Sequence, residues 1–163
     1  MRELSLFSGA GGGLLATKHL LGWKTIGYVE NELYCQKVIR QRIEDGLLDP
    51  APIFGDIRDF IREGYAESYK GVVDVVSGGF PCQDISCANP SGKGIDGEQS
   101  GLWAEMERVV CEVRPQYAFV ENSPMLTIRG LGTVLQGLAQ MGYDAKWGCF
   151  TAYHVGAIHK RER

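Results

Sequence analysis

The fold of this chain is decided by the stretch Val72-Val73-Asp74-Val75-Val76-Ser77-Gly78-Gly79-Phe80-Pro81-Cys82-Gln83-Asp84. A valine-rich run that ends in glycines is typical of a buried strand in a parallel sheet. Such a strand delivers Cys82 to its carboxyl end, where open α/β sheets build their binding sites. Pro81 fixes its own φ angle and favours an extended Phe80, so the thiol follows a stiff, non-helical turn. We therefore predict that Cys82 is a nucleophile, although an unpaired cysteine is more often simply a small buried residue.

The composition is that of an ordinary globular protein. The 163 residues are 44% hydrophobic and 23% charged, which suits one domain with a single core. No apolar run approaches the roughly 20 residues of a membrane helix, and the first residues lead into a strand-like segment rather than a signal peptide. The cysteines form no C-x-x-C pair, which argues against disulfides and against a zinc site; they are Cys35, Cys82, Cys87, Cys111 and Cys149. We expect a cytoplasmic protein with reduced thiols and no bound metal.

The charge of the chain bears on whether it binds nucleic acid. A net charge of −3 and a pI near 5.6 give no overall basic footprint of the kind that nucleic-acid-binding proteins show. Any phosphate contacts must therefore come from a local patch such as Lys160-Arg161-Glu162-Arg163, or from another polypeptide. A charged run of this kind is otherwise usually a solvated tail.

Strand-like and helical segments alternate along the chain, which predicts an α/β fold. Strands are expected at residues 3–7, 24–29, 53–54, 72–76, 117–120 and 145–153, and helical patterns at 14–21, 32–45, 57–61, 101–114 and 131–141. Residues 84–101 are rich in Ser, Gly, Asn and Asp, and beside a nucleophile such a segment predicts a mobile lid.

A glycine-rich turn follows the first strand, at Ser8-Gly9-Ala10-Gly11-Gly12-Gly13. Strand, glycine turn and helix open a nucleotide-binding α/β unit, because glycines let the backbone approach a ligand. The same turn also serves as a tight connection without a ligand. Glu30 ends the second strand about 20 residues further on, where dinucleotide-binding folds hydrogen-bond a ribose hydroxyl. This spacing favours an adenosine-type ligand.

Three more polar residues at strand ends each have two interpretations. Asn31 either contributes to the ligand site or caps the helix that follows it. Asp56 either binds a ligand or caps the short helix after the third strand. Glu121 is placed to act as an acid or to hydrogen-bond a bound base, whereas a helix cap or a surface salt bridge is the ordinary role of such a residue.

Several motifs then fall into one order along the chain: Phe7-Ser8-Gly9-Ala10-Gly11-Gly12, Glu30, Gly55-Asp56-Ile57, Gly79-Phe80-Pro81-Cys82-Gln83, Glu121-Asn122 and Arg161-Glu162-Arg163. This order resembles that of the DNA cytosine-5 methyltransferases from the first strand to the last residue. The specific part is the Pro-Cys-Gln turn followed by Glu-Asn at the next strand. The resemblance implies a Rossmann-like S-adenosylmethionine-dependent methyltransferase fold. Its sheet would be mostly parallel with helices on both faces, here lacking the last antiparallel strand.

The resemblance also implies S-adenosylmethionine as methyl donor and S-adenosylhomocysteine as product. The residues it places at the cofactor are Phe7, Gly9, Ala10, Gly11, Gly12, Glu30, Asn31, Asp56, Ile57, Pro81 and Leu102. Cys82 would attack C6 of a cytosine flipped out of DNA, and Glu121 would protonate N3. Arg161 and Arg163 would promote the thiolate and contact the base and nearby phosphates.

Members of that family continue into an inserted antiparallel strand, a DNA-reading domain and a helix that packs back against the cofactor site. We therefore expect residues 1–163 to form an incomplete S-adenosylmethionine-binding catalytic domain without a target-recognition domain. The chain would be an amino-terminal fragment, a truncated product, or half of a split enzyme with a complementing polypeptide. His159, Ser123 and Ser5 depart from the residues that are usual in the family.

Other functions remain compatible with these residues. One is a non-catalytic cofactor-binding or partner module derived from such an enzyme, and the acidic net charge suits protein contacts. Another is an enzyme that adds the same thiol to C6 of a free nucleotide, which the glycine turn with its downstream acid disfavours. An RNA cytosine would undergo the same chemistry as a DNA cytosine.

Overall fold

The computed structural model describes residues 1–81 and 101–159. The chain forms two compact units. The first comprises Met1–Gly79 and Arg108–Val120, and the second comprises Phe80–Glu107 and Glu121–Arg163, of which 82–100 and 160–163 are outside the described residues.

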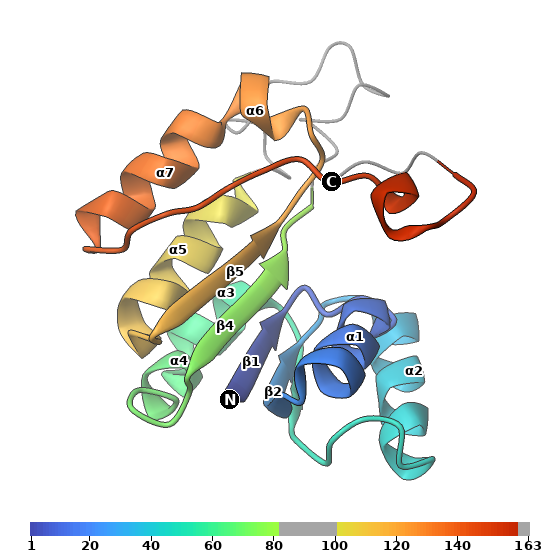
Figure 1. The fold of residues 1–163 in the computed structure, drawn as a ribbon. Helices are drawn as coiled ribbons and strands as arrows, with labels where there is room; N and C mark the ends of the chain where they lie inside the picture. The colour runs from blue at the N-terminus through green and yellow to red at the C-terminus, as the bar shows by residue number, and fades with distance from the viewer. Residues whose placement is uncertain (82–100, 160–163) are drawn as a thin grey trace. The chain divides into compact units, whose positions relative to one another are not determined.

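A five-stranded sheet organises the first unit (Figure 1). Its strands are β1 (Arg2–Leu6), β2 (Lys24–Val29), β3 (Ile53–Phe54), β4 (Val75–Gly79) and β5 (Tyr117–Glu121). The order across the sheet is β3-β2-β1-β4-β5, and the pairs β1–β2, β1–β4 and β2–β3 are parallel. In Figure 1, β5 runs in the same direction beside β4. The predicted parallel sheet is confirmed.

The strand order reverses between β1 and β4, because the chain steps from β1 outward to β3 and then returns to the other side. Ligands of open α/β sheets bind beyond the carboxyl ends of the strands at such a switch point. Leu6 at the end of β1 pairs with Gly78 in β4. The glycine turn therefore leaves the sheet next to the strand that leads towards Cys82.

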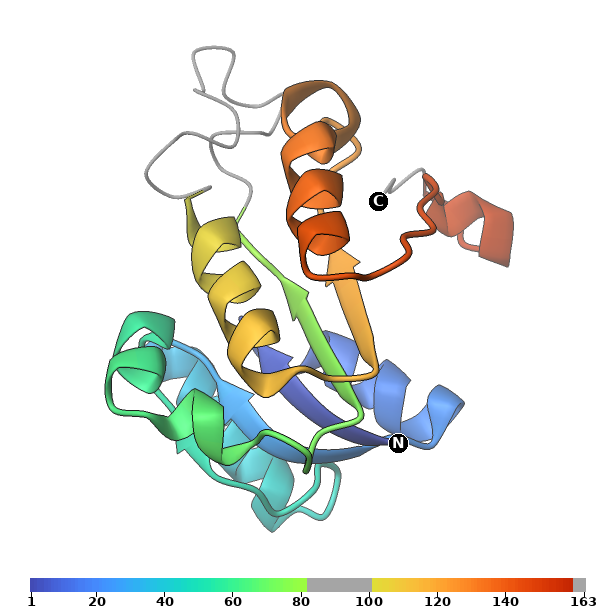
Figure 2. The ribbon, with the colours of Figure 1, turned by 90° about the vertical axis from the view of Figure 1, so that its left-hand side faces the viewer.

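Helices cover both faces of this sheet, as predicted (Figures 1 and 2). They are α1 (Gly12–Leu21), α2 (Leu33–Glu44), α3 (Ile57–Arg62), α4 (Tyr65–Ser68) and the Arg108–Val113 part of α5 (Leu102–Val113). Parallel strands are joined by right-handed crossovers, and the direction of each step decides which face receives the helix. The steps from β1 to β3 place α1 and α2 on one face, and the steps from β3 to β5 place α3, α4 and α5 on the other.

The core of the sheet is apolar and almost completely buried. Leu4, Leu6, Val75 and Val76 are at most 1% exposed. The strand predicted at 72–76 begins at Val75 instead, because the parallel register joins Glu3 to Val75. Val72 is 42% exposed, before the strand.

The helix predicted at 14–21 is confirmed as α1, but only part of its apolar surface is buried. Leu20 and Leu21 are 81% and 57% exposed. The buried residues of α1 are Leu14 and Thr17. Leu14 belongs to a core cluster with Tyr28, Ile39 and Leu48, which joins α1 to β2 and α2. The last turn of α1, before its cap at Gly22, extends beyond this cluster.

The second unit contains α6 (Leu126–Arg129), α7 (Leu131–Gln140) and a short 3-10 helix, η2 (Ala152–Val155). The prediction of α7 is confirmed, with Val134, Gly137 and Leu138 buried. The prediction of a strand at 145–153 is wrong. Residues 144–150 are exposed and have no regular structure, because no described strand pairs with their backbone groups. No helix in the described ranges has both the length and the apolar character to cross a membrane.

Candidate functional site

The glycine turn after β1 adopts a backbone that few other sequences allow. Gly9 and Gly11 have φ angles of +54° and +83°, in the left-handed region that L side chains avoid. The Gly11 amide donates to the Ser8 carbonyl at 3.0 Å, which closes the turn. No side chain caps the start of α1 at Gly11. The amides of the first turn of α1 are therefore available to a polar ligand group.

Phe7 is the first residue of this turn and is strained. Its φ of +51° is unusual for a bulky residue, and among the described non-glycine residues only Arg114 shares a positive φ. Strained backbone persists where the surrounding structure enforces it, and it concentrates at ligand sites. No sequence pattern indicated this strain.

Glu30 connects the ends of three neighbouring strands. Its Oε2 accepts from the Gly9 amide at 2.6 Å, and its Oε1 accepts from the Glu32 amide at 2.8 Å. Its own amide donates to the Phe54 carbonyl at 3.0 Å. The residue is only 9% exposed. Each carboxylate oxygen accepts one amide and keeps a further lone pair, so the group can still accept hydrogen bonds from ligand hydroxyls.

A helix side chain fixes Glu30 from the other direction. Gln36 of α2 donates through Nε2 to the Glu30 carbonyl at 2.6 Å. Gln36 belongs to none of the sequence motifs, and its only signal was its position about one turn into the helix that follows the acid. The backbone and side chain of Glu30 are thus both held in place.

Asn31 and Asp56 follow β2 and β3. Asn31 is exposed, and α2 is capped instead by Glu32, whose side chain accepts from the Tyr34 amide at 3.4 Å. The predicted capping role of Asn31 is therefore wrong, because α2 begins one residue later than that role requires. The capping interpretation of Asp56 is confirmed, since its side chain accepts from the Arg58 amide at 2.7 Å. Ile57 begins α3 and is 4% exposed.

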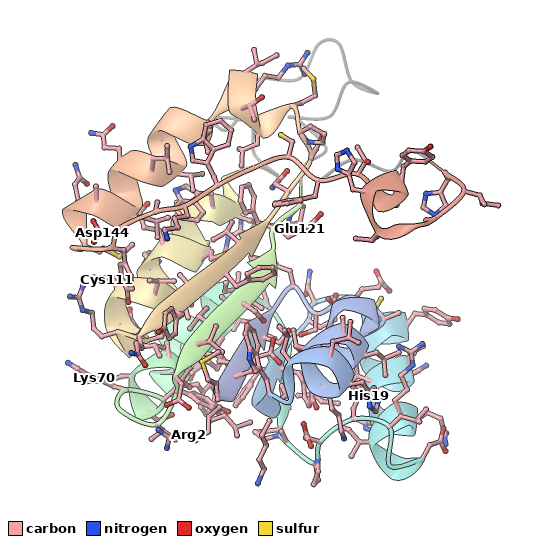
Figure 3. The ribbon with its side chains drawn as sticks, in the orientation of Figure 1. Arg2, His19, Lys70, Cys111, Glu121 and Asp144 are labelled. Carbon is pink, nitrogen blue, oxygen red and sulfur yellow. The ribbon has the colours of Figure 1, made fainter. Side chains whose placement is uncertain are left out.

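Glu121 and Asn122 belong to the second unit. Glu121 is the last residue of β5 and is half-buried (Figure 3). Asn122 is 9% exposed and donates through Nδ2 to the Phe80 carbonyl at 3.1 Å. The Phe80 ring packs against Trp103, with ring centroids 5.7 Å apart. Asn122 and Trp103 therefore fix the backbone that leads into Pro81. The sequence motif included Asn122 but gave it no separate role.

Some predicted site residues are not brought together by the described structure. Cys82, Arg161 and Arg163 lie outside the described residues, as do 84–100 of the predicted lid. Pro81 and Leu102 are partly buried in the second unit, and their cofactor contacts stay predictions. In the first unit, by contrast, the residues predicted at the cofactor all follow the carboxyl ends of β1, β2 and β3.

Two observations bear on other chemistry. Burial, and then the charges of Glu30 and Glu32, raise the pKa of the Cys35 thiol. Cys35 is therefore a poor nucleophile, since the reactive form is the thiolate.

Within 1–81 and 101–159, no group of three or more His, Cys, Asp or Glu side chains is arranged to hold a metal ion.

Comparison with known proteins gives a consistent set of matches. The family described as C-5 cytosine-specific DNA methylase matches residues 1–163. Type II methyltransferase M.CviJI of Paramecium bursaria Chlorella virus IL3A is 32% identical, over 99% of this chain and 41% of its own length. M.Sau3AI of Staphylococcus aureus is 25% identical, over 100% of this chain and 42% of its own length. M.PspPI of Psychrobacter sp. (strain TA137) is 29% identical, over 98% of this chain and 37% of its own length. The chain spans about two fifths of the length of these relatives.

Proposed function

Because this chain belongs to the C-5 cytosine-specific DNA methylase family, we propose that it supplies the cofactor-binding and nucleophile-bearing part of a DNA (cytosine-5-)-methyltransferase. The observation that supports this most is the junction at Glu30, where one buried carboxylate joins the glycine turn to the ends of β2 and β3. A tight turn that served only as a connection would not require strained backbone at Phe7 and a buried acid with spare acceptor capacity.

The proposed cofactor is S-adenosylmethionine, which supplies a methyl group activated by its sulfonium. The first unit fits it in three respects. Glu30 accepts hydrogen bonds from the ribose hydroxyls, and the backbone of Gly9 to Gly12 approaches the methionine part closely. Phe7 and Ile57 provide apolar contact for the adenine, while Asp56 and Asn31 present polar groups at its edge. The Glu30 carboxylate oxygens each accept one backbone amide, so they face donors and are oriented to accept further hydrogen bonds from hydroxyls.

The proposed nucleophile is Cys82. Its thiolate forms a bond to C6 of a flipped cytosine, and Glu121 donates a proton to N3, so that electron density is displaced to C5. C5 would take the methyl group from the sulfonium, with S-adenosylhomocysteine as the leaving group. A base then removes the C5 proton, the carbon–sulfur bond breaks to release the thiolate, and N3 returns its proton to Glu121. Asn122 contributes by holding the Phe80 carbonyl, two residues before the sulfur. Arg161 and Arg163 stabilise the thiolate and contact the base.

We further propose that methyl transfer requires polypeptide that this sequence does not include. The relatives are more than twice as long as the part that this chain matches. Sequence readout by DNA-binding proteins uses base contacts, and the chain's net charge of −3 provides no general attraction for the phosphate backbone. A complementing polypeptide that carries a target-recognition part would supply both the base contacts and the attraction for the phosphates. Without one, a role as a non-catalytic cofactor-binding or partner module is the alternative.

Titration calorimetry with S-adenosylmethionine tests the cofactor site. The variant Glu30→Gln loses one acceptor oxygen and the negative charge, and since a hydrogen bond to a charged group contributes about 1.5 to 3 kcal/mol, its dissociation constant should rise at least about tenfold. The control Glu44→Gln removes an exposed charge from the end of α2 and should bind like the wild type. Wild-type protein that does not bind the cofactor, or equal affinities for wild type and Glu30→Gln, would contradict the proposal.

A further inference from the structure

A side chain from α2 reaches across to the glycine turn. Arg42 donates through Nη1 to the carbonyl of Ala10, which lies 32 residues earlier in the chain. Ala10 lies between Gly9 and Gly11 in the turn and is exposed. The sequence motifs gave Arg42 no role, and it belongs to none of the residues predicted at the cofactor.

The bond acts on one peptide group of the turn. The Ala10 carbonyl and the Gly11 amide are the two ends of the same planar peptide group. The amide end donates to the Ser8 carbonyl at 3.0 Å, and the carbonyl end accepts from Arg42. With both ends bonded, the peptide plane is fixed, and with it the φ angle of +83° at Gly11. Without the guanidinium, a glycine-rich turn has a wide choice of backbone conformations.

Arg42 is itself well anchored. Its carbonyl accepts from the amides of Leu47 and Leu48 at 2.8 and 3.0 Å, which ties the end of α2 to the following chain. Leu48 is 2% exposed and packs in the core cluster with Leu14 of α1. A Cβ at Gly11 would lie 3.3 Å from both Arg42 Nη1 and Leu48 Cδ1. Gly11 therefore packs closely against Arg42 and against Leu48 of the core cluster.

We propose that Arg42 is a positioning residue that holds the glycine turn in its ligand-binding shape through Ala10. This inference rests on the proposed role of the turn in binding S-adenosylmethionine. A turn that is ordered before binding loses less conformational entropy when the ligand arrives. Arg42 therefore acts on cofactor affinity and not on the chemical step, and it acts without touching the cofactor.

The test compares Arg42→Met, Arg42→Lys and the wild type. Methionine keeps much of the apolar stem but removes every donor, whereas lysine keeps a charged donor without the planar guanidinium. Arg40→Met is the matched control, because it removes an exposed cation from the same helix. The measurements are amide hydrogen exchange of Gly9 to Gly13 without ligand, calorimetric titration with S-adenosylmethionine, and urea unfolding.

For Arg42→Met we expect the turn amides to exchange about tenfold faster and the cofactor dissociation constant to rise about tenfold, as the loss of one charge-assisted hydrogen bond implies. Arg42→Lys should show smaller increases in the exchange rate and in the dissociation constant, and Arg40→Met should show neither increase. Exchange and affinity of Arg42→Met within twofold of the wild type would overturn the inference. So would an acceleration shared by all amides, because that reports global destabilisation. If the wild type binds no cofactor while Arg42→Met still loosens the turn alone, the positioning role stands and the proposed function fails.

Discussion

Replacing Glu3 with leucine removes the acceptor of three buried hydroxyl groups. The Glu3 carboxylate is completely buried between β1 and its neighbours. Its Oε2 accepts from Thr17 Oγ1 and Thr25 Oγ1, both at 2.9 Å, and its Oε1 accepts from Ser77 Oγ at 2.6 Å. The carboxylate therefore joins α1, β2 and β4 to β1 in the middle of the sheet.

The size of the effect follows from what each hydroxyl keeps. Thr17 retains a second acceptor, the Leu14 carbonyl at 3.2 Å. Thr25 and Ser77 lose the acceptor that Glu3 provides. Each buried polar group left unsatisfied costs about 1 to 3 kcal/mol, so Glu3→Leu should lower the free energy of unfolding by about 2 to 6 kcal/mol. Glu3→Gln keeps a carbonyl oxygen and adds an amide that can donate to a hydroxyl oxygen, so its cost should be nearer 1 kcal/mol.

Urea unfolding, followed by circular dichroism, measures both variants against the wild type. The exposed Glu44→Gln is the control and should stay within about 0.5 kcal/mol. If Glu3→Leu fails to fold, Glu3→Gln still provides the comparison. A loss of less than about 1 kcal/mol in the free energy of unfolding of Glu3→Leu, or an equal loss in Glu3→Gln and Glu3→Leu, would contradict the role of the carboxylate as a shared acceptor.

Three further predictions concern the same unit. Burial, and then the charge of Asp49, raise the pKa of Tyr28 to about 12. The free energy of unfolding should therefore fall by about 2 to 3 kcal/mol as the pH rises from about 10, the pKa of an unfolded tyrosine, to about 12. Tyr28→Phe has no group that titrates there and should not show this fall. Parallel curves of stability against pH for the two proteins would contradict this prediction. Gly11→Ala should cost about 1 to 2 kcal/mol in urea unfolding, because alanine is strained at a left-handed φ, and an unchanged midpoint would count against it. A Cβ in Gly27→Ala would lie 2.5 Å from the Tyr69 hydroxyl, so this variant should displace Tyr69 and lower the melting temperature, whereas an unshifted transition would show that the ring moves without cost.

The sequence predicted most of the fold because the informative patterns are local. Each of the five strands and the longer helices was recognised from apolar periodicity and from the residues that end it. The exact start of β4 was not, because it is set by its pairing with Glu3 of β1, far away in the sequence. The exposure of Leu20 and the absence of a strand at 145–153 depend in the same way on which neighbours are present.

The candidate site shows the same division. The spacing between the glycine turn and Glu30 identified a contact that the structure contains, from the Gly9 amide to the carboxylate. The roles of Gln36 and Arg42 were not predictable, because they depend on how α2 packs beside the turn. The cap of α2 was misplaced by one residue, since Asn31 and Glu32 both have side chains able to cap and only geometry distinguishes them.

The central proposal is that Cys82 adds to C6 of a cytosine during methyl transfer, and adduct trapping tests it most directly. Duplex DNA with 5-fluorocytosine in the target is incubated with S-adenosylmethionine, this chain and a complementing polypeptide. Fluorine at C5 cannot leave as a proton, so the carbon–sulfur bond persists and the adduct survives denaturing electrophoresis. We predict an adduct that requires the cofactor, forms equally with the exposed-site control Cys111→Ser, and is absent with Cys82→Ser. An adduct that persists in Cys82→Ser, or no adduct with the wild type, would contradict the proposal.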